Sequence, residues 1–278
     1  MKLRHLRTLA GQGERTDQFR VRLAGVAVDD KDNLLAVGDR EVKRFSPDGL
    51  LELNFPTRDA GWSVAADGDS IWVGMQGAIE RYDREGKFIA VIEDTNRLGI
   101  ITSIGAKGSR LIAADSTHRT IHLYENGVWK AEVGQDVNSR GFMIPNGVLD
   151  LALAADGESF IVAHSQKHRV ERYSFAGELV AKFGRFGMEQ PGDFGGCCNP
   201  TNIVALNATT FVVSEKAPPK LKVYSSDGQF QSQFVGVFAA NTKNIDLAAD
   251  SRGRIYATDP ARCSIEQFEQ VASNGLSE

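Results

Sequence analysis

The chain has 278 residues, of which 42% are hydrophobic and 24% charged, with a formal net charge of −4 at neutral pH. This composition is typical of a globular protein, and the acidic balance argues against a nucleic-acid partner, which needs a dense basic surface. No apolar run approaches the roughly 18 residues of a membrane span, and residues 1–5 lead into no apolar signal-peptide core. The three cysteines, two of them adjacent, make no disulfide framework, so we expect a cytoplasmic protein, with a processed secreted or periplasmic protein left open.

The first predicted strand lies close to the N-terminus and has a counterpart near the other end of the chain. Residues 5–11 resemble residues 230–236, which occupy the outermost strand position of a later repeat. The linker that follows residue 11 likewise resembles the one that follows residue 184. This similarity suggests that the N-terminal strand is the outer strand of a repeat that begins elsewhere.

From residue 26 onward, the same order of segments returns six times: a short strand, a turn, an apolar strand, a loop, and a strand ending in an aromatic residue. The first strands begin 38 to 52 residues apart, at Val26, Val64, Ile104, Leu151, Ile203 and Leu247. The third strands end at Phe45, Tyr82, Tyr124, Tyr173, Tyr224 and Phe268. Short strands at such regular spacing predict an all-β fold, a six-bladed β-propeller.

The sixth repeat lacks a fourth strand of its own. Its third strand ends at Phe268, and the polar residues 269–278 follow without a turn signal. We therefore expect residues 4–10 to complete the last blade, because this removes the free sheet edge. The predicted organisation is a single propeller over residues 1–268 with a polar tail over residues 269–278.

The repeats resemble the NHL-repeat propeller family. Residues 184–224 follow its pattern with Pro200, Ile203 and Tyr224 in register, and residues 134–173 follow it with Pro145, Gly147 and Tyr173. The resemblance covers nearly the whole chain, and Cys197-Cys198-Asn199-Pro200 with Ser214-Glu215-Lys216 looks like a bacterial subgroup. The family resemblance implies a binding module, and no established activity carries over from the subgroup.

In a propeller, the starts of the first strands and the ends of the second strands meet at one mouth, where ligands usually bind. The second strands end at Gly38, Met75, Asp115, His164, Glu215 and Asp259, and the first strands are preceded by Asn146, Asn202 and Asn244, with Asp150 and Asp246 close by. Aspartate at a strand end commonly caps the following loop, which is the simpler interpretation of Asp115 and Asp259. The longer Glu215 and His164 are better candidates to reach a ligand.

The longest linker carries the adjacent Cys197 and Cys198, for which three interpretations stay open: small buried residues, a redox-active pair, or soft metal ligands. The predicted ligand-binding residues, expected in one pocket with His164 at its margin, are Cys197, Cys198, Asn199, Asn202, Glu215, Lys216, His164 and Asn146. The predicted metal ligands, for calcium or zinc, are Cys197, Cys198, Cys263, Glu215 and Asp259.

Two functions follow. The first is a monomeric binding module that recognises a peptide, protein or small molecule, with no nucleic acid and no membrane involved. The alternative is a metal-dependent hydrolase or lactonase. Six-bladed lactonases and phosphotriesterases look similar in architecture and hold calcium in the channel with glutamate, asparagine and aspartate. Asn146, Asn202 and Asp259 match in type, whereas blade one offers Gly25 and Val26 where a glutamate is wanted.

Overall fold

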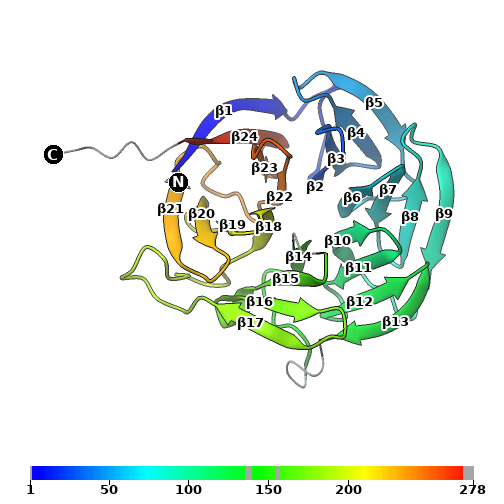
Figure 1. Ribbon diagram of the computed structural model, residues 1–278. Helices are drawn as coiled ribbons and strands as arrows, with labels where there is room; N and C mark the ends of the chain where they lie inside the picture. The colour runs from blue at the N-terminus through cyan, green and yellow to red at the C-terminus, as the bar shows by residue number, and fades with distance from the viewer. Residues whose placement is uncertain (1, 135–139, 155–156, 272–278) are drawn as a thin grey trace.

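A computed structural model describes residues 2–134, 140–154 and 157–271. It confirms the prediction of an all-β propeller with six four-stranded antiparallel blades around a central axis (Figure 1). Blades one to three consist of β2 (Leu23–Val28), β3 (Leu34–Gly38), β4 (Glu41–Phe45) and β5 (Leu51–Pro56); β6 (Ser63–Asp67), β7 (Ser70–Gly74), β8 (Ala78–Tyr82) and β9 (Phe88–Glu93); and β10 (Ile101–Lys107), β11 (Arg110–Asp115), β12 (Thr120–Glu125) and β13 (Val128–Val133).

Blades four and five consist of β14 (Asp150–Leu153), β15 (Ser159–His164), β16 (Arg169–Ser174) and β17 (Leu179–Phe183), and of β18 (Asn202–Asn207), β19 (Thr210–Glu215), β20 (Lys220–Ser225) and β21 (Phe230–Val235). Blade six consists of β22 (Leu247–Ala249), β23 (Ile255–Asp259), β24 (Ser264–Val271) and β1 (Lys2–Ala10). Within the described ranges, the one helical segment is a 3₁₀ turn, Ser165–Lys167, and no helix there is long and apolar enough to cross a membrane.

The last blade is closed by the N-terminal strand, as the sequence predicted. Strand β1 pairs with β24 from Lys2 opposite Val271 to Ala10 opposite Ser264, and the two strands lie side by side in Figure 1. The predicted boundary at Phe268 is three residues short, because β24 continues to Val271. The polar residues after Phe268 extend β24 because they can pair with polar residues of β1. Arg4 of β1, for example, donates to Glu269 at 2.7 Å. Residues 272–278 of the predicted tail lie outside the described residues.

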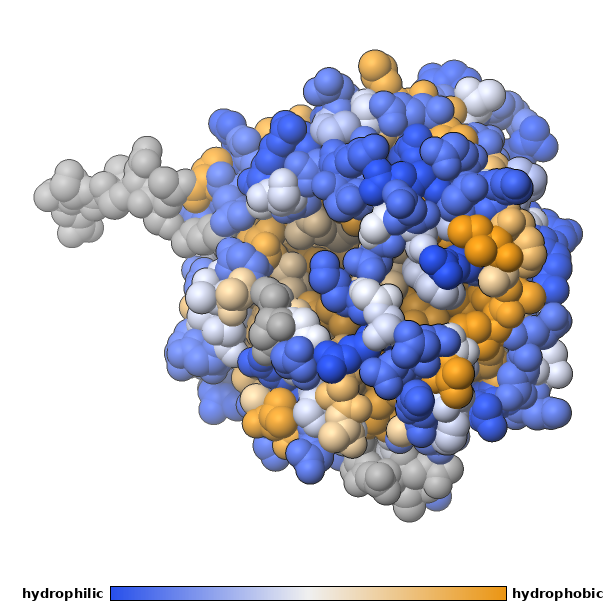
Figure 2. All heavy atoms as spheres, turned by 45° about the vertical axis from the view of Figure 1, so that its right-hand side comes forward, coloured by the Kyte–Doolittle hydropathy of each residue, from blue (hydrophilic) through white to orange (hydrophobic). Residues whose placement is uncertain are grey.

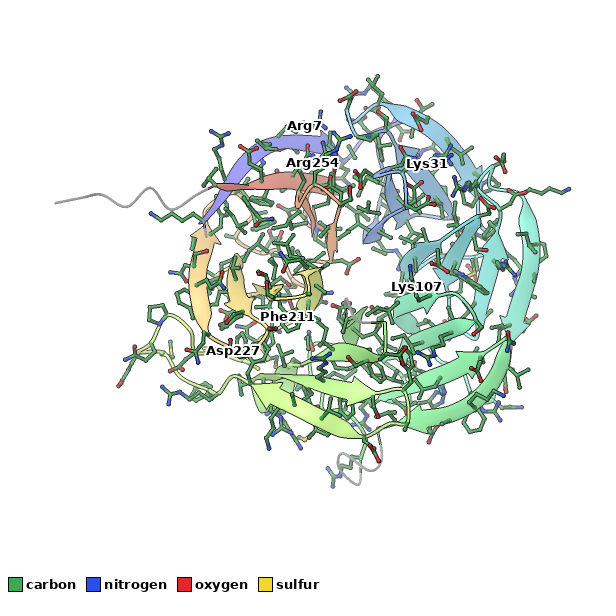
Figure 3. All side chains as sticks on the ribbon, viewed as in Figure 1. Arg7, Lys31, Lys107, Phe211, Asp227 and Arg254 are labelled. Carbon is green, nitrogen blue, oxygen red and sulfur yellow. The ribbon has the colours of Figure 1, made fainter. Side chains whose placement is uncertain are left out.

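Two arginines form hydrogen bonds across the contact between blades six and one, which we call the seam. Arg7 of β1 and the half-buried Arg254, which precedes β23, both donate to the carbonyl oxygen of Pro47 in blade one, at 2.9 and 3.1 Å. Both residues lie at this seam in Figure 3. The ring is thus held by side chains as well as by the β1–β24 ladder.

The hydrophobic core lies between neighbouring blades rather than in the centre. Val37 and Val42 of blade one, for example, pack with Val64 and Val73 of blade two, and each side chain so buried stabilises the fold by about 1.5–3 kcal/mol. The residue directly after the apolar start of each innermost strand is small or medium-sized, and this set lines a central channel: Ala27, Ala65, Gly105, Ala152, Val204 and Ala248. The hollow in the middle of Figure 2 shows these apolar walls below a hydrophilic rim.

Candidate functional site

Four polar residues at the ends of the second strands form what we call the outer ring: Asp115, His164, Glu215 and Asp259. The sequence placed them at the mouth, but each is at most 1% exposed and lies between the loop after its own strand and the linker that enters its blade. Asp115 accepts backbone N–H bonds from Gly99 at 2.7 Å and Thr117 at 2.8 Å. Burial would raise the pKa of Asp115, but hydrogen bonds from His122 and Gly99 outweigh it and lower the pKa to about 2. The capping interpretation therefore describes Asp115.

Asp259 has the same role in blade six. Its carboxylate accepts the Ala239 N–H at 2.8 Å, the Thr242 hydroxyl, and the Arg262 guanidinium Nε–H at 2.7 Å. In blade one the second strand ends at Gly38, and the next residue, Asp39, has this role. Asp39 accepts N–H bonds from the linker, at 2.7 Å from Arg20 and 2.9 Å from Arg22. These aspartates join the loop and the linker of one blade.

His164 does not lie at the margin of a ligand pocket. Its Nε2 accepts the Met143 N–H at 3.1 Å, so Nδ1 carries the proton and donates to Glu171 at 3.0 Å. Glu171 also accepts from Arg169 and Tyr173, and although burial opposes it, the bond from His164 helps to lower the pKa of Glu171 to about 2. His164 is a linker anchor, and all of its hydrogen-bonding capacity is used.

Glu215 likewise has its own partners. It lies 2.7 Å from the Lys222 ammonium and 3.2 Å from that of Lys220, both on the paired strand β20. Lys222 in turn donates to the carbonyl oxygen of Asp193 in the linker, at 2.6 Å. The register of β19 and β20 sets these two lysines against Glu215, so its carboxylate is paired within its own blade rather than facing an open pocket.

The Cys-Cys-Asn-Pro segment packs on the Ser-Glu-Lys loop through a structural contact. Asn199 donates to the carbonyl oxygens of Gly195 at 2.7 Å and Lys216 at 3.0 Å, and accepts from the Lys216 N–H at 2.9 Å. Cys197 is an exposed free thiol and Cys198 a buried one beside it. Burial raises the pKa of Cys198 to about 11, which disfavours the reactive thiolate.

The predicted metal ligands do not come together. Cys263 is buried in the core between blades six and one, with its sulfur 3.5 Å from the carbonyl oxygen of Val21. Glu215 and Asp259 are held by the partners given above. Across residues 2–134, 140–154 and 157–271, no three histidine, cysteine, aspartate or glutamate side chains form a group that could bind a metal ion.

A second set of residues stands around the channel, one before the apolar start of each innermost strand. We call it the inner ring: Gly25, Ser63, Ser103, Asp150, Asn202 and Asp246. Blades one to three contribute only glycine and serine, whereas blades four to six contribute two carboxylates and an amide. The position is equivalent in every blade, so the difference lies in the side chains alone.

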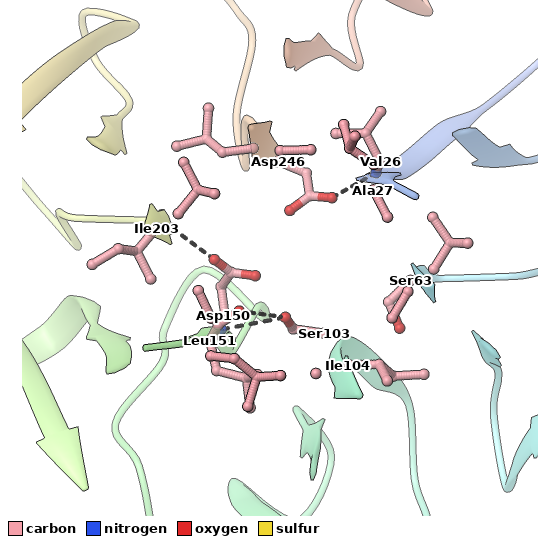
Figure 4. Close-up of a pocket in the computed structure, with 18 of the residues that line it drawn as sticks. Val26, Ala27, Ser63, Ser103, Ile104, Asp150, Leu151, Ile203 and Asp246 are labelled. Carbon is pink, nitrogen blue, oxygen red and sulfur yellow. Dashed lines mark hydrogen bonds between the residues drawn. The ribbon is translucent and has the colours of Figure 1, made fainter. Parts of the chain in front are cut away.

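Most inner-ring side chains bond to the innermost strand of the next blade. The Ser63 hydroxyl donates to the Ile101 carbonyl at 2.8 Å and that of Ser103 to the Leu151 carbonyl at 3.1 Å. Asp150 accepts the Ile203 N–H and Asp246 accepts the Val26 N–H, each at 2.7 Å (Figure 4). A serine is enough to join two blades, so the carboxylates offer more than this structural role requires.

Asp150 and Asp246 point into the same space at the centre of the ring (Figure 4). In the described part of the chain, neither forms a salt bridge with lysine, arginine or histidine. Burial raises the pKa of Asp246 to about 7, and burial together with the charge of Asp246 raises that of Asp150 well above its ordinary value. At neutral pH the two carboxyl groups therefore retain a proton between them.

Asn202 lies between these acids and is only 2% exposed. Its Nδ2 faces Asp246 Oδ1 at 3.4 Å, while its Oδ1 has no hydrogen-bond partner among the described residues. An unsatisfied buried acceptor costs about 1–3 kcal/mol. Such an atom at the mouth of a channel marks a place where a ligand atom would be stabilised.

The mouth above Asn202 is a pocket of about 180 Å³ to which all six blades contribute, and it shares Thr102 and Asp246 with the channel of about 210 Å³ below. Its walls are largely apolar: Leu23, Ala24, Trp62, Val148 and Pro260. Asn146 does not line it directly but donates to Asn244, which does, at 3.0 Å. Of the predicted ligand-binding residues, Asn202 thus lines the mouth, and Asn146 reaches it through its hydrogen bond to Asn244.

The sequence noted Asp150 and Asp246 but did not select them. One signal was present: at the position before the first strand, blades four to six carry Asp, Asn and Asp where blades one to three carry Gly, Ser and Ser. The pairing of the two acids could not be recognised locally, because they belong to blades separated by the whole of blade five.

The sequence matches no family model and no curated protein. Among solved structures, it is similar to a streptogramin B lyase, with 13% identity, a TM-score of 0.60, and coverage of 89% of this chain and 78% of the other. It is similar to the WD40 propeller domain of Doa1, with 12% identity, a TM-score of 0.58 and 99% of both chains covered. It is also similar to a chain of a mitotic checkpoint complex, with 12% identity, a TM-score of 0.66, and coverage of 96% and 92%. At these identities the likeness establishes the fold alone, and the chain is a six-bladed β-propeller.

Proposed function

We propose that this chain is an NHL-like propeller that serves as a binding module and recognises a partner at the channel mouth. The observation that carries the proposal is the inner ring of blades four to six. It presents Asp150, Asp246 and the unpaired Oδ1 of Asn202 to a pocket, although the fold needs only serine at this position. Buried acceptors without donors are a cost that a bound ligand removes.

Two further observations support binding at this end of the channel. The pocket combines apolar walls with a few convergent polar groups, as ligand sites usually do. Two of the similar structures are a WD40 propeller domain and a chain from a checkpoint complex, and the latter belongs to a protein assembly. A peptide segment of a protein partner is therefore the class of ligand that we favour.

The proposal can be tested by selecting peptides from a random phage-displayed library on the full-length protein. We expect enriched peptides whose binding is lost in Lys243→Glu, since Lys243 is exposed at the rim of the mouth. The matched control is Lys130→Glu, the same charge change on the exposed outer strand β13. Enriched peptides that bind both variants equally, or no enrichment at all, would contradict recognition at the mouth.

A second candidate is a hydrolase or lactonase that uses a cation in the channel. The observation in its favour is the set of oxygen atoms of Asp150, Asp246 and Asn202, which are the ligand type that calcium prefers. One of the proteins with a similar fold is a streptogramin B lyase, which supports this second candidate. Asp259, which the sequence suggested for this role, is instead occupied by Ala239, Thr242 and Arg262.

Isothermal titration with calcium, zinc and manganese separates the two functions. Stoichiometric binding to the wild type that is lost in Asp246→Asn would favour the cation-dependent enzyme. Binding of a selected peptide to protein stripped of metal by a chelator would favour the module.

A further inference from the structure

The inner ring of blades four to six presents more hydrogen-bond acceptors than donors toward the channel. The hydroxyl groups of Ser63, Thr102 and Ser103 donate to the backbone carbonyls of Ile101, Leu149 and Leu151. What remains toward the channel are the oxygens of Asp150, Asp246 and Asn202. The complementary ligand group therefore donates hydrogen bonds and carries positive charge.

The number and origin of the acceptors distinguish among cations. They come from three successive blades, one side chain each. A primary ammonium has three N–H donors, one for each acceptor side chain, whereas a guanidinium presents its donors in a planar fork that pairs best with a single bidentate carboxylate. Calcium needs six to eight oxygen ligands, more than these side chains supply.

The walls above the acceptors favour an alkyl chain. Leu23, Trp62, Val148 and Pro260 form an apolar sleeve at the mouth, and Asp246 and Asn202 lie at its inner end. Methylene groups gain from such walls while an ammonium reaches the acids, as in a lysine side chain. A bare metal ion makes no use of them.

The rim adds a second element of recognition. Lys243 is exposed there, and Arg22 stacks over Trp62 with its guanidinium carbon 4.2 Å from the ring centroid. These are the only other charged residues that line the described mouth or channel. Because Arg22 and Lys243 at the rim are cationic, they can pair with acidic residues of a partner on either side of the group that enters the mouth.

From this geometry we propose that the mouth binds a primary ammonium on an alkyl chain, namely a lysine side chain flanked by acidic residues in a protein partner. The inference rests on the proposed binding function and specifies its ligand. When the ammonium enters, the proton held between Asp150 and Asp246 leaves to solvent. Binding therefore strengthens as the pH rises through about 7, where the Asp246 carboxyl group loses its proton.

The test uses a fluorescein-labelled peptide with a central lysine between two glutamates, read by fluorescence anisotropy on the full chain at pH 8 without added metal. We expect the peptide with Nε-acetyl-lysine, and that with arginine, to bind at least about tenfold more weakly. Asp246→Asn should weaken lysine binding at least about tenfold and abolish its pH dependence, whereas Glu132→Gln on β13 should change neither.

Several results would overturn the inference. They are equal binding of the acetylated peptide, unchanged binding to Asp246→Asn, no binding of the lysine peptide at pH 8, or displacement of the lysine peptide by calcium chloride. If library peptides selected on the mouth lack basic residues, the ligand class is wrong while the binding module stands. If no peptide is enriched and the lysine probe does not bind, both proposals fall.

Discussion

The outer ring and the inner ring both bury carboxylates, but their surroundings differ in the donors that they provide. Asp115, Asp259 and Glu215 of the outer ring each meet backbone N–H groups, arginine, histidine or lysine. Asp150 and Asp246 of the inner ring each receive one backbone N–H bond and face each other without a cation in the described structure. The pKa values follow: that of Asp115 falls to about 2, and that of Asp246 rises to about 7.

This difference shows that the type of a polar residue in a repeat does not indicate its role. A carboxylate whose oxygens are occupied holds the fold, whereas one with spare acceptors and a raised pKa is kept at a cost to stability and is a candidate for function. Substitutions in the two rings should therefore change stability in opposite directions.

Opening the propeller should have the largest effect, because it disrupts both rings. Deleting residues 1–12 removes β1 and leaves β24 as an unpaired edge next to the seam that the Asp246–Val26 bond crosses. We expect aggregation or a large loss of thermal stability, measured by size-exclusion chromatography and thermal unfolding. A truncated protein that stays monomeric with an unchanged melting temperature would show that the β1–β24 ladder is dispensable.

Glu215→Ala should destabilise the protein by about 3–5 kcal/mol, because it leaves the ammonium of Lys222 buried without its partner. Urea unfolding of the wild type and the variant measures the difference. As a control, the double variant Glu215→Leu with Lys222→Met removes both charges and should recover most of the loss. A single variant as stable as the wild type would place Glu215 outside the structural ring.

Asp246→Asn should stabilise the protein at pH 8 by about 1–3 kcal/mol. The folded pKa of about 7 lies above the ordinary value of 3.8, so the contribution of protonated Asp246 to stability is fully present below pH 4 and is lost as the pH rises toward 7. The gain should vanish near pH 4 in a series of denaturant titrations.

Glu171 should show the opposite pH dependence of stability in the same series of denaturant titrations. Its folded pKa of about 2 lies below the ordinary 4.5, so its contribution is present above pH 4.5 and is lost as the pH falls toward 2. Glu171→Gln should therefore destabilise the folded protein at neutral pH. A loss of stability in Asp246→Asn at pH 8 would contradict the difference that we draw between the two rings.

The smallest effect concerns the cysteines beside the outer ring. A maleimide should label Cys197 rapidly in the native protein, whereas Cys198 and Cys263, both buried and with raised thiol pKa values, should react only after unfolding. Mass spectrometry counts the labels, and Cys197→Ser should take up none in the native state. Rapid labelling of Cys198 would mean that this loop is open rather than packed on Lys216.

The sequence by itself determined the blades and their closure, because both depend on local patterns that recur. Apolar segments separated by turn residues specify each strand, and the likeness of residues 5–11 to residues 230–236 assigns the N-terminal strand to an outer position. It also identified Asn202 and Asn146, since both precede a first strand that must start at the mouth.

Only the tertiary structure decided which polar residues are free to bind. Glu215 and His164 looked available because their partners, Lys222 and the Met143 N–H, are brought to them by strand register and by a linker from earlier in the chain. Asp150 and Asp246 looked ordinary because each is the one inner-ring residue of its own blade. They become a pair only when ring closure sets blades four, five and six around one axis, where burial raises the pKa of both and the charge of Asp246 raises that of Asp150 further.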